Sequence, residues 1–202
     1  LDELIGGFCE GELIVIGSRP GIGKTSVILS MILSHLRDKI PVALYSLELE
    51  RVSITDRLIS MDSKIPVSQL RTGKITANEY KKIVKGLNKL SQANLHFIEG
   101  NIFRLDAFLE IISKLIRENG IRVLYIDYLQ LMISNRPGRN REQEVSELMR
   151  SLKSMALKCK IPVVIASQMN RYVEWRGGSK RPFLSDLRES GSIEEIADKV
   201  LF

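Results

Sequence analysis

Apolar positions along the chain alternate between short continuous runs and longer stretches with helical spacing. The short runs are rich in aliphatic and β-branched residues and predict strands. They are Leu13–Ile16, Val42–Tyr45, Leu95–Ile98, Val123–Ile126, Val163–Ala166 and Lys199–Phe202. Most are apolar at consecutive positions, as expected of strands that helices cover on both faces. The pattern predicts an α/β fold with a mainly parallel, twisted sheet flanked by helices on both faces.

The stretches between the strands predict helices. They are Lys24–Arg37, Ser53–Met61, Ala77–Ser91, Arg104–Arg117 and Glu142–Cys159. The last two place apolar residues three and four positions apart, so each presents an apolar stripe to the sheet, and we assign these stripes no functional role. Glycine, proline and arginine gather at Asn135–Asn140 and Glu174–Pro182, which predicts loops there.

Composition excludes several classes of protein. The chain has 202 residues, 44% hydrophobic and 27% charged, which is typical of a globular domain and not of a disordered chain. No apolar run approaches the ~20 residues of a membrane-spanning helix. Cys9 and Cys159 are far apart and the two histidines are isolated, so a zinc site or a disulfide framework is not expected. This cysteine usage fits a reducing, cytoplasmic compartment.

The net charge of +6 is concentrated in part of the chain. Between positions 171 and 188, five basic residues outnumber two acidic ones, an excess of +3: Arg171, Arg176, Lys180, Arg181 and Arg188 against Glu174 and Asp186. A second basic loop covers positions 136–141. Such segments fit polyanion binding, although from charge alone solvated surface loops are the simpler interpretation.

A glycine-rich turn between the first strand and the first long helix predicts a phosphate-binding loop. It meets the pattern GxxxxGK(S/T), except that serine replaces the first glycine. Its residues are Ser18, Arg19, Pro20, Gly21, Ile22, Gly23, Lys24, Thr25 and Ser26. The glycines let the backbone amides approach phosphate oxygens at a helix N-terminus. Lys24 then places a positive charge on the β- and γ-phosphates of ATP, and Thr25 offers a hydroxyl to Mg²⁺.

Polar side chains follow three other predicted strands. Asp127 comes directly after the fourth strand, where a carboxylate faces the ligand crevice of a parallel sheet and can support Mg²⁺. Glu48 follows the second strand, and we expect it to orient or deprotonate the attacking water. Glu50 is the alternative for that role, and either can be a plain surface residue. Gln168 follows the fifth strand and can contact the γ-phosphate, although alone it would be interpreted as a loop residue.

Together these blocks resemble the helicase domain of the DnaB-type replicative DNA helicases over essentially the whole chain. Many NTPases share the phosphate loop, but IDYLQLM (126–132) and SDLRESGSIE (185–194) are far more specific, and Ser46–Glu48 and Ser167–Arg171 match in order and spacing. The resemblance implies a RecA-like P-loop NTPase core, a ring hexamer with ATP between subunits, and unwinding of duplex DNA at the replication fork. It also implies primase and a helicase loader as partners.

The resemblance implies roles for single residues. Glu48 is the catalytic carboxylate, Lys24 and Thr25 bind phosphate and Mg²⁺, Asp127 supports Mg²⁺ through water, and Gln168 senses the γ-phosphate.

Arg57 matches a family arginine near the nucleotide. Arg188, Glu189 and Gly191 match the central loop that follows the backbone of single-stranded DNA. Charge at Arg188 and a backbone N–H at Gly191 suit a motor that binds phosphates without reading bases. An ion pair of Arg188 with Asp186 or Glu189 is the alternative.

The chain starts without methionine and ends inside a predicted strand, so we expect residues 1–202 to be one domain of a longer protein. The resemblance implies an N-terminal domain and a segment with an arginine finger, and we expect both to lie outside residues 1–202. Because such a finger is typically worth ~10³–10⁵ in rate, we expect this chain alone to hydrolyse ATP poorly.

Two other functions share parts of the pattern. A filament-forming RecA-type recombinase would not be expected to carry SDLRESGSIE, and a DNA clamp without turnover would not need every phosphate-site residue intact. Tyr172 and Trp175 can offer stacking surfaces, as in other single-strand binders. The resemblance gives them no such role, so we interpret them as surface or interface residues.

Overall fold

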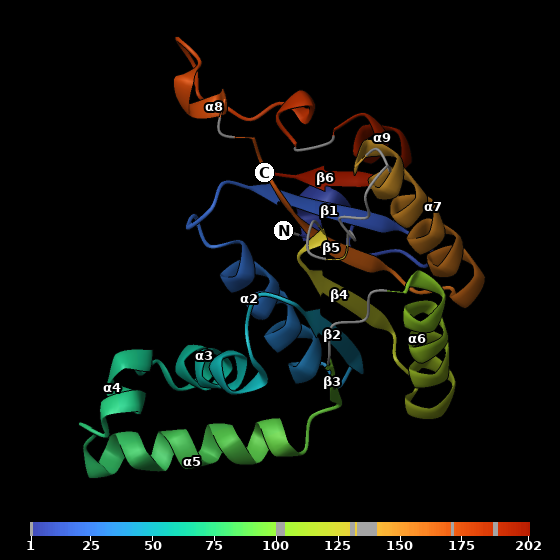
Figure 1. Ribbon diagram of the computed structural model, residues 1–202. Helices are drawn as coiled ribbons and strands as arrows, with labels where there is room; N and C mark the ends of the chain where they lie inside the picture. Colours follow the sequence, from blue (N-terminus) through green and yellow to red (C-terminus); the bar gives the residue numbers. More distant parts are fainter. Residues whose placement is uncertain (1, 100–103, 130–131, 133–140, 171, 188–189) are drawn as a thin grey trace.

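A six-stranded parallel sheet forms the centre of the protein (Figure 1). The computed structural model describes residues 2–99, 104–129, 132, 141–170, 172–187 and 190–202. The strands are β1 (Leu13–Ser18), β2 (Val42–Ser46), β3 (Leu95–Ile98), β4 (Val123–Asp127), β5 (Val163–Gln168) and β6 (Lys199–Leu201), and their order in the sheet is β3-β2-β4-β5-β1-β6. The predicted parallel α/β sheet is confirmed.

Helices connect the strands and cover both faces of the sheet. They are α1 (Asp2–Ile5), α2 (Lys24–Arg37), α3 (Arg51–Ser63), α4 (Val67–Thr72), α5 (Ala77–Ser91), α6 (Leu105–Asn119), α7 (Arg141–Cys159), α8 (Tyr172–Trp175) and α9 (Ser190–Ile196), with a short 3₁₀ turn at Leu184–Asp186. All five predicted helices are present, with small changes at their ends. The loop predicted at Asn135–Asn140 lies outside the described residues, and α8 overlaps the start of the one predicted at Glu174–Pro182. None of the described helices is both long and apolar enough to cross a membrane.

The core is divided between the two faces of the sheet. Along β1, Leu13 and Val15 belong to the cluster that contains the buried sides of α6, α7 and α9. The alternate residues, Ile14 and Ile16, belong to the cluster on the other face, under α2 and α3. Because successive side chains of a strand point to opposite faces, a continuous apolar run is what a sheet covered on both sides requires.

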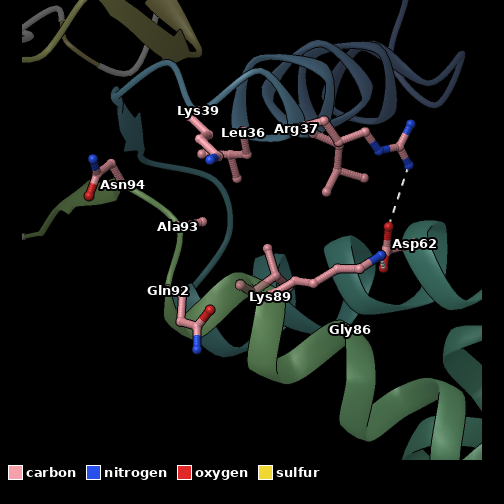
Figure 2. A pocket seen from close by; sticks show the side chains of 11 residues that line it. Leu36, Arg37, Lys39, Asp62, Gly86, Lys89, Gln92, Ala93 and Asn94 are labelled. Carbon is pink, nitrogen blue, oxygen red and sulfur yellow. Dashed lines mark hydrogen bonds and ion pairs between the residues drawn. The ribbon is translucent and has the colours of Figure 1, made fainter.

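α3 packs against α2, and α5 packs on α3, farther from the sheet. A cavity of about 460 Å³ lies between α3, α5 and the last turn of α2 (Figure 2). At its rim, the Asp62 carboxylate accepts hydrogen bonds from Arg37 at 3.4 Å and from Lys89 at 3.2 Å. These ion pairs join α2, α3 and α5. Since α2 is 14 residues long, the cavity is roughly 20 Å from the helix start, where the phosphate loop lies.

The carboxyl ends of four neighbouring strands meet at one edge of the sheet. Ser18 at the end of β1 is in register with Gln168 at the end of β5, and Ser46 at the end of β2 is in register with Asp127 at the end of β4. Ligands of open parallel sheets bind outside this edge. The strand order therefore gathers segments from four distant parts of the chain at one crevice.

Candidate nucleotide-binding and catalytic site

The loop between β1 and α2 has the backbone geometry that its glycines predict. Gly21 and Gly23 have φ angles of 78° and 112°, in the region that side chains disfavour. Gly23 is also the N-terminal cap of α2, which has no side-chain cap and no acidic residue in its first turn. The first N–H groups of α2 are therefore open to an anion, and the helix dipole favours one there.

Lys24, Thr25 and Asp127 meet at the start of α2. The Thr25 hydroxyl donates a hydrogen bond of 2.7 Å to Asp127 Oδ2, and Lys24 Nζ lies 4.0 Å from Asp127 Oδ1. These atoms come from residues about a hundred positions apart in the chain, joined here because β1 and β4 end at the same edge. The structure thus brings together the predicted phosphate and metal residues.

Glu48 and Arg57 lie close enough to Asp127 to influence its ionisation. Burial raises the pKa of the Asp127 carboxyl above its ordinary value, and the negative charge of Glu48 adds to that rise. The hydrogen bond from Thr25 and the positive charges of Lys24 and Arg57 act in the opposite direction. Charges that perturb one another at a sheet edge are typical of functional sites.

The two candidate carboxylates after β2 have different surroundings. Glu48 is exposed, and its negative charge raises the pKa of Asp127. Glu50 caps α3, and its backbone carbonyl accepts a hydrogen bond of 3.1 Å from the Ile54 amide. Of the two, Glu48 is the one whose charge affects Asp127, and both residues border a common cavity of about 420 Å³.

The side chains around Asp127 fit a divalent cation. Asp127 Oδ1 is buried and accepts no hydrogen bond from any described residue, and the Thr25 hydroxyl lies beside the other carboxylate oxygen. A buried carboxylate oxygen of this kind costs free energy unless a partner binds it. Hard oxygen ligands beside a phosphate loop are the environment that Mg²⁺ prefers.

The segment after β5 turns back on itself. Met169 donates a backbone hydrogen bond of 3.0 Å to Ser18, and it pairs with Leu187 in an antiparallel bridge. Gln168 therefore stands beside the phosphate loop, while Leu187 leads into the predicted DNA segment. Of that segment, Arg188 and Glu189 lie outside the described residues. Gly191 is exposed in the first turn of α9.

Two contacts were not anticipated from the sequence. The Tyr128 ring lies under Lys24, whose Nζ is 4.2 Å from the ring centroid. Asp186 is buried and forms an ion pair with Arg176. The position of Tyr128 directly after Asp127 was the only available signal for the first contact, and nothing in the charge pattern singled out Arg176 as the partner for the second.

This fold and this phosphate loop define a nucleotide-binding domain of the P-loop class with a RecA-like core. The sequence model for the DnaB-like helicase C-terminal domain matches residues 1–202. The chain therefore belongs to the family of DnaB-like helicase C-terminal domains.

Relatives and solved structures agree with this assignment. The chain is 36% identical over 203 residues to replicative DNA helicase DnaB of Helicobacter pylori (strain J99 / ATCC 700824), and 38% identical over 205 residues to that of Geobacillus stearothermophilus. Each alignment covers 100% of this chain, but it covers only 42% and 45% of the respective relatives. The chain thus spans less than half the length of these proteins.

Among solved structures, an ATPase domain matches with a TM-score of 0.91 at 29% identity, over 98% of this chain and 71% of that one. A DnaB-like replicative helicase, described with its interactions with primase, matches with a TM-score of 0.89 at 29% identity. That match covers 96% of this chain and 47% of the helicase. The predicted RecA-like fold is confirmed.

Proposed function

We propose that this chain is the motor domain of a replicative DNA helicase. The whole protein would assemble as a ring hexamer, hydrolyse ATP, move along one strand of DNA and unwind the duplex at the replication fork. The observation that carries the proposal is the cluster of Lys24, Thr25 and Asp127 at the sheet edge, in a chain that belongs to this helicase family.

Each residue at the edge has a part in phosphoryl transfer. The phosphate loop and Lys24 bind the β- and γ-phosphates, and Thr25 and Asp127 are the residues that would hold Mg²⁺. Bound Mg²⁺ neutralises charge on the phosphates. Glu48 orients water and accepts its proton as the water oxygen attacks the γ-phosphorus; the bond to the β–γ bridging oxygen breaks, leaving ADP and phosphate.

The path from hydrolysis to movement runs through the segment after β5. Gln168 contacts the γ-phosphate, so loss of phosphate changes the position of the residues that follow it. The bridge between Met169 and Leu187 supports this route, because it connects the end of β5 to the start of Arg188–Gly191. Those residues would hold the phosphates of single-stranded DNA. Arg57 would help bind the nucleotide, and primase and a loader would contact the whole protein.

The test is ATP hydrolysis stimulated by single-stranded DNA, measured for the whole protein and two matched variants. Glu48→Gln should lower the rate roughly 10²–10⁴-fold while ATP binding is kept, because only the base is lost. Glu50→Gln, two positions away, should leave the rate near that of the unaltered protein. Equal losses in both variants, or none in Glu48→Gln, would overturn the catalytic assignment. A protein that binds ATP and DNA without turnover would be a clamp.

A further inference from the structure

The short helix α8 carries an exposed pair of aromatic residues. Tyr172 is 66% exposed and Trp175 is 74% exposed. Their ring centroids are 5.6 Å apart and their planes meet at 82°, an edge-to-face arrangement. Positions three apart lie on the same side of a helical turn. Val173, 1% exposed, packs into the core from a different side. The helix is therefore anchored by one residue and presents two rings to its surroundings.

The base of this segment is firmly held. Asn170 donates a backbone hydrogen bond of 2.7 Å to Asp186, next to the bridge between Met169 and Leu187. Arg176, directly after α8, forms an ion pair with Asp186. Its guanidinium also stacks on the Phe183 ring, with Cζ 4.8 Å from the ring centroid. These contacts position the rings before any ligand arrives, which lowers the cost of ordering them on binding. Figure 1 shows α8 standing apart from the helices that cover the sheet.

The basic residues that follow α8 in the chain favour a polyanion as the ligand. Lys180 and Arg181 are exposed, and neither forms an ion pair within the part of the chain that the structure describes. Phe183, 54% exposed, adds a third ring, which stacks against Arg176. Aromatic faces combined with unpaired cations are typical of surfaces that bind single-stranded nucleic acid, where bases stack on rings and phosphates meet the charges. An apolar protein segment would leave these cations without a counter-charge.

We infer that Tyr172 and Trp175 form a base-stacking platform for single-stranded DNA, with Lys180 and Arg181 holding adjacent phosphates. The inference rests on the proposed function and deepens it. Residues Arg188–Gly191 were assigned to the DNA backbone, whereas this platform would contact bases. Stacking is tolerant of sequence because every base has a π-face, so the contact suits a motor that must pass over any sequence.

Trp175 is the only tryptophan among these 202 residues, so the part of the emission that Trp175→Phe removes reports on this site. The protein, with a non-hydrolysable ATP analogue, is titrated with an oligo(dT) strand and with an abasic strand of equal length. Oligo(dT) should quench the tryptophan emission. The abasic strand should bind about 10-fold more weakly and leave the emission unchanged, since it offers phosphates without bases.

Variants are compared by the anisotropy of a labelled oligo(dT). Trp175→Ala should weaken binding about 10-fold, and Trp175→Phe should recover most of the loss because a ring is kept. Tyr80→Ala is the matched control, because Tyr80 is an aromatic residue on α5 that is 59% exposed. Its binding should equal that of the unaltered protein.

Three results would overturn the inference. Tight binding of oligo(dT) without quenching, and without an effect of Trp175→Ala, would refute the platform but keep the helicase proposal. A tryptophan emission that follows protein concentration and ignores DNA would assign the rings to an interface between copies of the chain. No binding to any single strand would refute both the platform and the proposed function.

Discussion

At the scale of the residue, Asp127 shows a conflict between stability and function. Its carboxylate is 1% exposed, and burial raises its pKa because the charged form has lost water. The Thr25 hydroxyl and the positive charges of Lys24 and Arg57 compensate only in part. A buried carboxylate with an oxygen that accepts no hydrogen bond lowers the stability of the fold unless a ligand binds that oxygen. Asp186 is also buried, at 5% exposed, but its carboxylate pairs with Arg176 and accepts a hydrogen bond of 2.8 Å from the Phe183 amide.

The two buried acids should therefore respond differently to the same substitution. Without nucleotide, Asp127→Asn should leave the free energy of unfolding unchanged or raise it by up to about 1 kcal/mol, because a buried charge is removed. Asp186→Asn should lower it by about 1–3 kcal/mol, because an ion pair is broken. Urea denaturation measures both.

Adding ATP and Mg²⁺ completes this comparison. Binding to the folded state at 100 times its Kd adds about 2.7 kcal/mol of stability. The unaltered protein and Asp186→Asn should gain stability in this way, and Asp127→Asn should lose the Mg²⁺-dependent part. If Asp127→Asn without nucleotide is as unstable as Asp186→Asn, Asp127 has a structural role and the proposed Mg²⁺ site is wrong.

At the scale of the element, the sequence predicts the strands and long helices, because their hydrophobic pattern extends over several residues or turns. The strands are visible as apolar runs, and α6 and α7 as stripes over four or more turns. The short helices α4, α8 and α9 have 6, 4 and 7 residues, too few for a period to appear. Their positions depend on distant contacts such as those of Val173 and Ile193 in the core. The phosphate loop was predictable because its motif is continuous in the sequence. The fold around α8 was not, because it depends on these distant contacts.

Close packing between elements constrains Gly17, the residue before the phosphate loop. A Cβ there would lie 2.6 Å from Leu187 Cδ2 and 3.0 Å from Phe202 Cε1. Gly17→Ala should therefore lower the free energy of unfolding by about 1–3 kcal/mol through overpacking.

The double variant with Leu187→Ala tests the cause of that loss. Truncating Leu187 removes the nearest atom, so Gly17→Ala should cost less in that background, a coupling that urea denaturation of the four proteins measures. An equal cost in both backgrounds would show that contact with Leu187 is not responsible. Gly177→Ala, where a Cβ meets nothing within 4 Å, serves as the neutral control.

Asp198 joins three elements and gives the stability a pH dependence. Asp198 lies just before β6. Its Oδ2 accepts a hydrogen bond of 2.6 Å from the Leu13 amide in β1 and one of 2.7 Å from Lys153 in α7. Burial raises the pKa of Asp198, but these hydrogen bonds and the lysine charge outweigh it, so its pKa lies below the ordinary value.

Because the folded-state pKa of Asp198 is lowered, the stabilisation is present above the ordinary pKa of ~4 and is lost as pH falls through the lower value. Asp198→Asn should cost about 1 kcal/mol at pH ~7, a modest figure because the pair is partly exposed. Urea denaturation across pH should show a constant difference down to about pH 4.5 and a shrinking one below. A difference that stays constant under acid conditions would contradict this account.

At the scale of the whole molecule, the order of the strands creates the site. The acids, the phosphate loop and Gln168 are far apart in the chain and meet because β2, β4, β5 and β1 are neighbours with parallel directions. Sequence reasoning could place each residue at a strand end, since the apolar runs mark those ends. It could not determine which strands are adjacent, nor that Tyr128 lies under Lys24, because these depend on tertiary packing.

We propose that ATP hydrolysis at this edge drives separation of DNA strands. Strand displacement on a forked DNA, by the whole protein and by its Glu48→Gln variant, tests it most directly. Unwinding that requires ATP and disappears in Glu48→Gln is the predicted result. DNA-stimulated hydrolysis without any unwinding would contradict the helicase and point to a recombinase-like role, and unwinding that survives Glu48→Gln would contradict the active site.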